Sequence, residues 1–156
     1  MDSEQMIATA IVDAAPAVVF GVLADPASHA AIDGTGWVRE ALDTAMLTTP
    51  GQMFRIAMYH DNHPAKHYEM ANRVEILDSP RTIAWQPGQA DAESGQIGFG
   101  GWIWRYDLEA VGPDRTKVTL TYDWSGATAE VRQFIQFPPF GQDHLDNSLR
   151  HLGELV

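Results

Sequence analysis

The stretch GWIWRYDLEAVGPDRTKVTLTYDW, Gly101–Trp124, carries the clearest structural signal in the sequence. Large apolar side chains alternate with polar ones through its first and last thirds, which is the two-residue period of a β-strand with one buried face. Between them, residues 111–115 combine Gly, Pro and Asp, which favour tight turns. The stretch therefore predicts an antiparallel hairpin with one apolar face.

The same two-residue period extends upstream of this hairpin. It predicts strands over 37–42, 52–60, 66–77 and 81–86. In the segment 66–77, one face collects Tyr68, Met70, Asn72, Val74 and Ile76. Strands with one polar face belong to a sheet that is covered on one side only. We therefore expect about six antiparallel strands in a single layer between residues 37 and 124.

Helical patterns flank this region on both sides. After a strand over 5–12, a helix over 16–25 is predicted, because proline is well tolerated in the first turn of a helix. A short second helix over 26–32 and a turn at 33–36 follow. At the other end, 127–135 predicts a short helix and 141–156 a longer one. The longer helix has one apolar stripe, formed by Leu145, Leu149, Leu152 and Val156. This helix is the natural cover for the sheet, which gives an α+β two-layer architecture.

Length and composition restrict the class of protein. At 156 residues, with 45% hydrophobic and 20% charged residues, the chain suits one globular domain over 1–156. The net charge of -11 argues against binding to nucleic acid or to anionic membranes. No apolar run approaches the roughly 20 residues of a membrane span. With no cysteine, the chain has neither disulfides nor thiolate sites. We expect a soluble, cytoplasmic protein.

Several segments resemble a known family. VDAAPAVVFGVLADPASHAAIDGTG (12–36) and FPPFGQDHLDNSLRHLGEL (137–155), together with shorter pieces such as YEMANRVEI and RTIAWQPG, are similar to SRPBCC proteins of the polyketide cyclase/dehydrase and lipid-transport family. The resemblance implies the helix-grip fold of the START-like superfamily, in which a curved antiparallel sheet wraps a long C-terminal helix around a cavity. It implies carriage of hydrophobic small molecules, with cyclisation or dehydration of polyketides in some members.

The inward strand faces supply the candidate ligand-binding residues. They are Phe54, Met58, Met70, Asn72, Trp85, Trp102, Trp104, Tyr106, Tyr122 and Trp124. These side chains could instead fill a solid core. However, the polar groups of Trp and Tyr need partners when buried, and Met suits irregular apolar ligands, so a cavity is favoured. Asn72 is the polar exception and should bond to a neighbouring strand or, less favoured, to a ligand.

Three histidines cluster in YHDNHPAKHYE (59–69). Alternation places His60 at the cavity mouth with Tyr68, leaves His63 in the turn and turns His67 to solvent. A zinc site needs at least three converging ligands, so no metal site is predicted, although a bend in the loop could still assemble one. Pairing Met58 with Met70, and His60 with Tyr68, makes these last two residues the candidate catalytic pair. His60 could equally be a rim residue that contacts only solvent.

The remaining polar motifs offer no chemistry. His29, His144 and His151 are interpreted as residues without a special role, the last two as solvated positions on the C-terminal helix. The glycine-rich segment 94–101 leads into a strand, so it is not a dinucleotide loop. We interpret it as a flexible loop at the cavity rim, where gating would be one role for it.

Three functions stay open at this point. The first is a carrier or sensor that binds a lipid-like or polyketide-like molecule. The second is a cyclase or dehydratase that uses His60 and Tyr68 on a carbonyl substrate and needs no cofactor. The third is a partner-binding module like the co-chaperones of the superfamily, which the mostly charged outer faces disfavour. The sequence leaves the oligomeric state open, with a dimer among the options.

Overall fold

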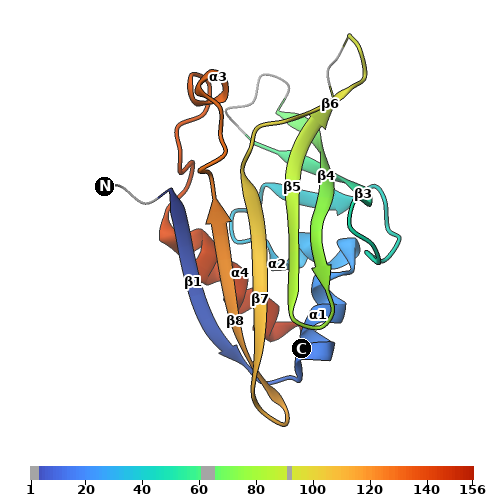
Figure 1. Cartoon of the computed structure of the whole chain (residues 1–156), viewed down its shortest axis with the longest axis vertical. Coiled ribbons are helices and arrows are strands. Elements are labelled where there is room, and N and C mark those ends of the chain that lie inside the picture. Colours follow the sequence, from blue (N-terminus) through green and yellow to red (C-terminus); the bar gives the residue numbers. More distant parts are fainter. Residues whose placement is uncertain (1–3, 61–65, 91–92) are drawn as a thin grey trace.

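The computed structural model describes residues 4–60, 66–90 and 93–156. The strands after the opening helices form one continuous antiparallel layer, with a long helix at the C-terminal end (Figure 1). The strands are β1 (Gln5–Val12), β2 (Val38–Ala41), β3 (Met53–Tyr59), β4 (His67–Asp78), β5 (Thr82–Ala90), β6 (Ile97–Phe99), β7 (Ile103–Gly112) and β8 (Arg115–Asp123). The helices are α1 (Pro16–Leu23), the 3-10 turn η1 (Pro26–Ser28), α2 (His29–Ile32), α3 (Ala129–Arg132) and α4 (Gln142–Glu154).

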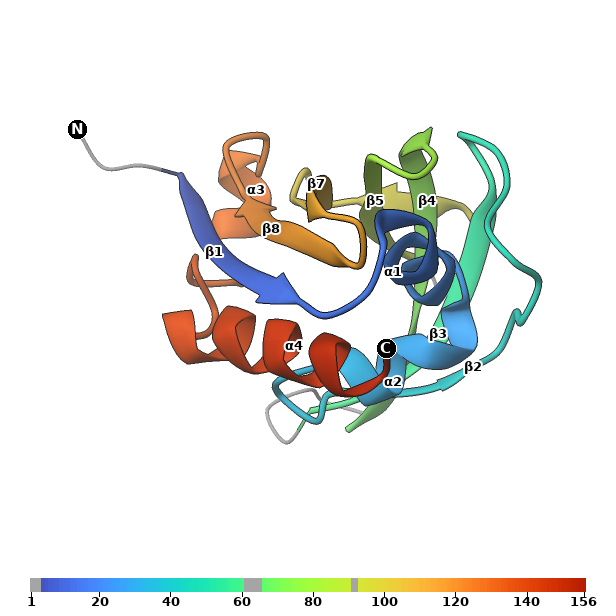
Figure 2. The same cartoon turned by 90° about the horizontal axis from the view of Figure 1, so that it is seen from below.

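The sheet runs in the order β1-β8-β7-β5-β4-β3-β2, with β6 paired to β5 outside this path. All of its pairings are antiparallel. Figure 2 shows the layer curling into a half-barrel, with α4 and α2 on its open side. The α+β helix-grip architecture expected from the sequence is therefore confirmed.

Local sequence explains how the chain enters the open side of the sheet. Pro16 occupies the first turn of α1, where its missing N–H costs nothing. The helix ends at Leu23, before the Asp25-Pro26 pair, and the Asp25 carboxylate accepts from the N–H of Ala27 at 3.1 Å to begin η1. These short helices deliver residues 33–38 to the space between α4 and the sheet.

The core lies where α4 meets the sheet. The leucines of the apolar stripe of α4 are buried as predicted, with Leu145 and Leu152 fully inaccessible to solvent, whereas Val156, beyond the end of the helix, is only partly buried. On β8, Val118 and Leu120 are equally inaccessible. Burial of side chains of this size contributes roughly 1.5–3 kcal/mol each. This packing joins α4 to the sheet.

One strand pairing differs from the prediction. Met58 lies opposite Tyr68 rather than Met70, and the backbone N–H of His60 donates to the carbonyl of Lys66 at 2.9 Å. His60 and Tyr68 are therefore diagonal neighbours instead of a direct pair. A shift of two residues keeps every side chain on its face, so the hydrophobic pattern could not distinguish the two registers. The predicted pairing would have needed an odd-length connection or a bulge near 62–65; these residues, and with them the predicted turn position of His63, lie outside the described residues.

The glycine-rich segment also differs from the prediction. Part of it forms β6, which pairs with β5 from Gly88 to Ala90. The Phe99 ring lies under the Arg73 guanidinium, 4.3 Å from it, and both Phe99 and Ile97 pack over Gly88. The segment is thus tied to the sheet in its middle and is not simply a flexible loop. Glycine content concealed a strand of only three residues.

The described helices are short compared with the thickness of a lipid bilayer. None of them is both long enough and apolar enough to cross a membrane.

Candidate functional site

A cavity of about 920 Å³ lies between the inner face of the sheet and α4. Its size falls within the ~300–1,000 Å³ range of small-molecule sites. The sheet provides one wall, through β3, β4, β5, β7 and β8. The loop 33–38 and α4 close one side, and residues 134–140, between α3 and α4, contribute seven consecutive positions to the lining.

Most of the predicted ligand-binding residues line this cavity. They are Met58, Met70, Asn72, Trp85, Trp102, Trp104, Tyr106 and Tyr122. The candidate catalytic residues His60 and Tyr68 also line it. Two predicted residues do not: Phe54 is buried behind Trp85, and Trp124 packs against Tyr122 with ring centres 5.6 Å apart. Both support the wall without reaching the space inside it.

Aromatic rings form a continuous surface near α4. Trp104 lies 4.6 Å from Tyr122 and stacks on Phe140 at 5.6 Å, measured between ring centres. Phe140 in turn lies 4.8 Å from Tyr122. The sheet and the segment 134–140 are thus joined by ring packing, and Trp102 adds a contact of 5.7 Å with Phe137. Such a surface can accept flat or branched apolar molecules without hydrogen bonds.

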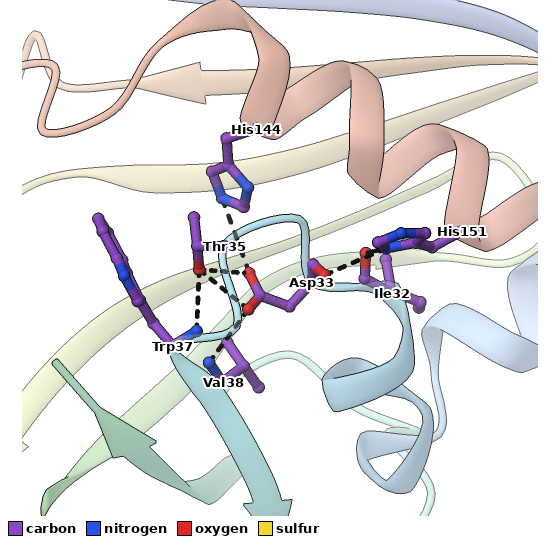
Figure 3. Close-up of polar contacts among 7 residues, drawn as sticks. All are labelled: Ile32, Asp33, Thr35, Trp37, Val38, His144 and His151. Carbon is purple, nitrogen blue, oxygen red and sulfur yellow. Dashed lines mark hydrogen bonds and ion pairs between the residues drawn. The ribbon is translucent and has the colours of Figure 1, made fainter.

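Asp33 supplies a carboxylate to this otherwise apolar space. Its side chain is 5% exposed, and it accepts from the Thr35 hydroxyl at 2.9 Å to each oxygen and from the N–H of Val38 at 3.1 Å. The Thr35 hydroxyl oxygen accepts in turn from the N–H of Trp37. Figure 3 shows how these bonds fold the loop around the carboxylate, which lies beneath His144 of α4. Among the described residues that line the cavity, Asp33 is the only Asp, Glu, Lys or Arg.

The prediction that His144 is a solvated position on the C-terminal helix is wrong. Its side chain is 9% exposed and lies between Trp104 and Phe140, 5.4 and 4.5 Å away between ring centres. Its Nε2 is 3.9 Å from Oδ1 of Asp33, which is too long for a hydrogen bond. Its Nδ1 is buried and has no hydrogen-bond partner among the described residues. Burial lowers the pKa of His144, against the opposing effect of Asp33, and this favours a neutral ring.

The other two histidines without a predicted role are also structural. His29 is buried, stacks on Trp85 at 4.9 Å and donates from Nε2 to the carbonyl of Leu23 at 2.8 Å. Burial lowers its pKa, so it too is held neutral. His151 is half-buried, and its Nδ1 donates to the carbonyls of Ile32 and Asp33, both at 3.1 Å. It thereby ties α4 to the start of the loop, as Figure 3 shows.

The tyrosines of the cavity respond to the same carboxylate. Burial raises the pKa of Tyr68 and Tyr106, and the negative charge of Asp33 raises both further. Burial alone raises the pKa of Tyr122. These hydroxyls therefore stay protonated at neutral pH and can donate hydrogen bonds. Asn72, which is 5% exposed, donates to the carbonyl of Phe54 over a long 3.5 Å, so its bond to the neighbouring strand is weak.

The histidine cluster of 59–69 offers no metal site within the part of the chain that the structure describes, where no three His, Asp or Glu side chains converge. The ring of His60 packs on that of Trp37, which also lines the cavity, with 4.4 Å between ring centres. His67 is exposed and packs on Tyr59. His63 lies outside the described residues.

Sequence reasoning missed the parts of the site that come from loops and from α4. Asp33 belongs to a DGTG segment that was interpreted as a turn only, and His144 lies one position before Leu145 of the apolar stripe. One signal could have found His144: at one residue from the stripe, it borders the buried face of the helix. No period marks residues 134–140, because they form neither helix nor strand beyond α3.

The chain has relatives in sequence among known proteins. No family model matches the chain. The chain is 30% identical over 125 residues to Rv0088, an uncharacterized protein of Mycobacterium tuberculosis, an alignment that covers 80% of this chain and 49% of that protein. It thus spans about half the length of the curated relatives it matches.

Solved structures match over nearly the whole chain. The protein Ms6760 from Mycobacterium smegmatis superimposes with a TM-score of 0.68 at 17% identity, covering 99% of this chain and 91% of the other. CV1439 from Chromobacterium violaceum gives a TM-score of 0.69 at 16% identity, covering 98% and 96%. The Aha1 dimer from Colwellia psychrerythraea gives 0.59 at 16% identity, covering 97% and 95%. Together with the curled sheet and the C-terminal helix, these likenesses show that the chain has the helix-grip fold.

Proposed function

We propose that the chain binds a hydrophobic small molecule, lipid-like or polyketide-like, in the cavity between the sheet and α4. The observation that carries this proposal is the cavity itself. About 920 Å³ of space is lined for the larger part by apolar and aromatic side chains, among them four Trp, three Tyr, three Phe and two Met. An apolar space of this size with a few convergent polar groups is the usual form of a small-molecule site.

Native mass spectrometry of freshly purified protein is the first test. We expect a mass above that of the bare chain, which falls to the bare mass on mild activation as the bound molecule leaves. Binding of an apolar fluorescent dye in the micromolar range is the second test. A bare mass together with no dye binding would refute the proposal.

Two tryptophan variants locate the binding. Trp104→Ala removes a ring from the cavity wall, and Trp124→Ala removes the same side chain from a position outside the lining. Loss of an aromatic contact surface should cost about 1.4 kcal/mol or more of binding, which is at least tenfold in dye affinity. We expect the larger loss for Trp104→Ala, because Trp124 acts on the cavity only through its packing against Tyr122. Equal affinity of the two variants would place the dye elsewhere on the molecule.

A second candidate function is a cyclase or dehydratase that acts on a carbonyl compound in the same cavity. The observation that favours it is the presence of His60 and Tyr68 on one stretch of the wall. The Tyr68 hydroxyl, with its raised pKa, is suited to donate to a carbonyl oxygen. His60 would remove a proton from the adjacent carbon and return it elsewhere, which needs no cofactor.

Proton exchange tests this second function without knowledge of the substrate. Incorporation of deuterium next to the carbonyl of 2-nonanone in D₂O is followed by NMR. Acid–base catalysis should accelerate exchange, and His60→Asn or Tyr68→Phe should each reduce the acceleration by about 10²-fold or more. No acceleration by the native chain would count against the function, and acceleration that survives both substitutions would remove these residues from it.

Partner binding ranks third. The exposed large apolar side chains that are described are spread over β1, α1, residues 42–53 and Phe134 among other places. A partner-binding surface usually gathers such side chains into one patch.

A further inference from the structure

We infer that Asp33 is the anchor for a cationic group, so that the molecule held in the cavity is a hydrophobic amine. This inference rests on the proposed binding function and specifies the chemical class of the ligand. It is carried by three features of the cavity: its charge, the gap between Asp33 and His144, and the aromatic wall around them.

The charge of the cavity is not balanced from within. Asp33 contributes a carboxylate, and no Lys or Arg occurs among the described residues that line the space. The Thr35 hydroxyl and the N–H of Val38 stabilise the carboxylate, but both are neutral donors. A buried carboxylate without a cation is costly, and the protein usually compensates for it with a paired charge. A bound cation would complete this pair.

His144 does not fill that role. Burial favours its neutral form, and the 3.9 Å between Nε2 and Oδ1 of Asp33 leaves the two groups without a hydrogen bond. A neutral imidazole has one nitrogen that accepts. An ammonium group placed beside Oδ1 could donate one N–H to Asp33 and another to Nε2 of His144. In this arrangement Nε2 is the accepting nitrogen, so the proton of the neutral ring lies on Nδ1, which is buried and has no partner among the described residues.

The surrounding rings suit a cation as well. Trp37 follows Asp33 in the same loop. The ring centres of Trp37 and Phe140 lie 6.2 Å apart. Trp104 and Phe140 border His144. The faces of aromatic rings, above all those of Trp, attract ammonium groups, and more strongly where water is excluded. An anionic head group would meet both the carboxylate and these ring faces, and would be repelled by both.

The test uses three molecules with the same chain and different heads: octylamine, 1-octanol and sodium octanoate. Their affinities for the full chain are measured by calorimetry near neutral pH, in low salt and in about 0.5 M NaCl, which screens the acidic surface. A charge-assisted hydrogen bond with the head group should make octylamine roughly tenfold to a hundredfold tighter than 1-octanol in both salts. Octanoate should be the weakest of the three.

Asp33→Asn is the decisive variant, because its amide oxygen can still accept from Thr35 and Val38 and so preserves the loop. It should abolish the advantage of octylamine over 1-octanol. Asp13→Asn is the matched control, since it changes the net charge equally at an exposed position that pairs with Arg115. This control should retain the advantage in full.

The outcomes separate the two proposals. If octylamine and 1-octanol bind the wild-type chain equally, Asp33 serves only to fold the loop and the amine inference is overturned, while binding of hydrophobic molecules stands. This comparison needs no variant, so it remains decisive even if Asp33→Asn fails to fold. If none of the three molecules binds, the proposed function fails and the inference fails with it.

Discussion

Gly34 should be the most sensitive glycine of the site. A Cβ atom added there would lie 2.3 Å from the carbonyl oxygen of His144, 2.8 Å from its Nδ1 and 3.0 Å from Cβ of Asn147. The first distance is roughly 1 Å inside ordinary van der Waals contact, and the atom it meets is helix backbone that cannot rotate away. Either α4 or the loop 33–38 must move, so Gly34→Ala should destabilise the fold through overpacking.

The magnitude follows from the packing. Overpacking of this kind costs about 2–3 kcal/mol, equivalent to roughly 5–10 °C in Tm for a chain of this size. Urea unfolding followed by tryptophan fluorescence measures it. Gly21→Ala is the control, because a Cβ atom there meets nothing within 4 Å. In the middle of α1 it should stabilise by about 0.5–1 kcal/mol. Equal stability of Gly34→Ala and the wild type would refute the close contact between the loop and α4.

Two further stability measurements address buried polar groups. Burial lowers the pKa of His29 and of His144, so the unfolded chain binds more protons than the folded one below its own histidine pKa of about 6.5. The free energy of unfolding should be highest above that pH and fall as the pH decreases from about 7.5 to 5.5, and a profile that rises instead would contradict the burial. On β8, the Thr116 hydroxyl donates to the carbonyl of Ala14 at 2.7 Å in a fully buried position. Thr116→Val should therefore lose about 1–3 kcal/mol in urea unfolding, whereas Thr9→Val on the exposed face of β1 should change stability by less than about 0.5 kcal/mol.

The strands could be predicted well from the sequence because one face of the sheet is buried and the other is exposed to solvent. Alternation in 66–77 and 101–124 assigns each side chain to a face, and those faces survive even where the register was predicted wrongly. The strand bounds of β1 and the first turn of α1 agree with the expected 5–12 and Pro16. Residues predicted from this period, such as Met58 and Tyr106, accordingly lie on the cavity wall.

The polar centre of the site was beyond such reasoning for a physical reason. Asp33 and His144 come from opposite ends of the chain, and only the curl of the sheet and the path of α4 bring them together. Asp33 belongs to no periodic pattern, and a lone Asp in a glycine-rich turn is usually solvated, whereas His144 borders the apolar stripe of α4 without being part of it. In the fold, His151 ties α4 to the start of this loop by donating to the carbonyls of Ile32 and Asp33. A period reveals which face of an element is buried, but not which loop enters the space behind it.

The strands and the loops make different contributions to the cavity: the strands form its apolar wall, and a loop supplies its carboxylate. The sheet supplies apolar wall from strands whose alternation any helix-grip sequence must keep, since losing it would unfold the layer. The loop 33–38 and residues 134–140 are not built on this alternation, although both are packed closely: Gly34 lies against α4, and Phe140 stacks on Trp104. In this chain the loop fixes its own carboxylate through Thr35 and Val38. Changing Asp33 should therefore alter which head group is accepted while the cavity that holds the apolar part stays intact, and this separation is what the octyl series measures.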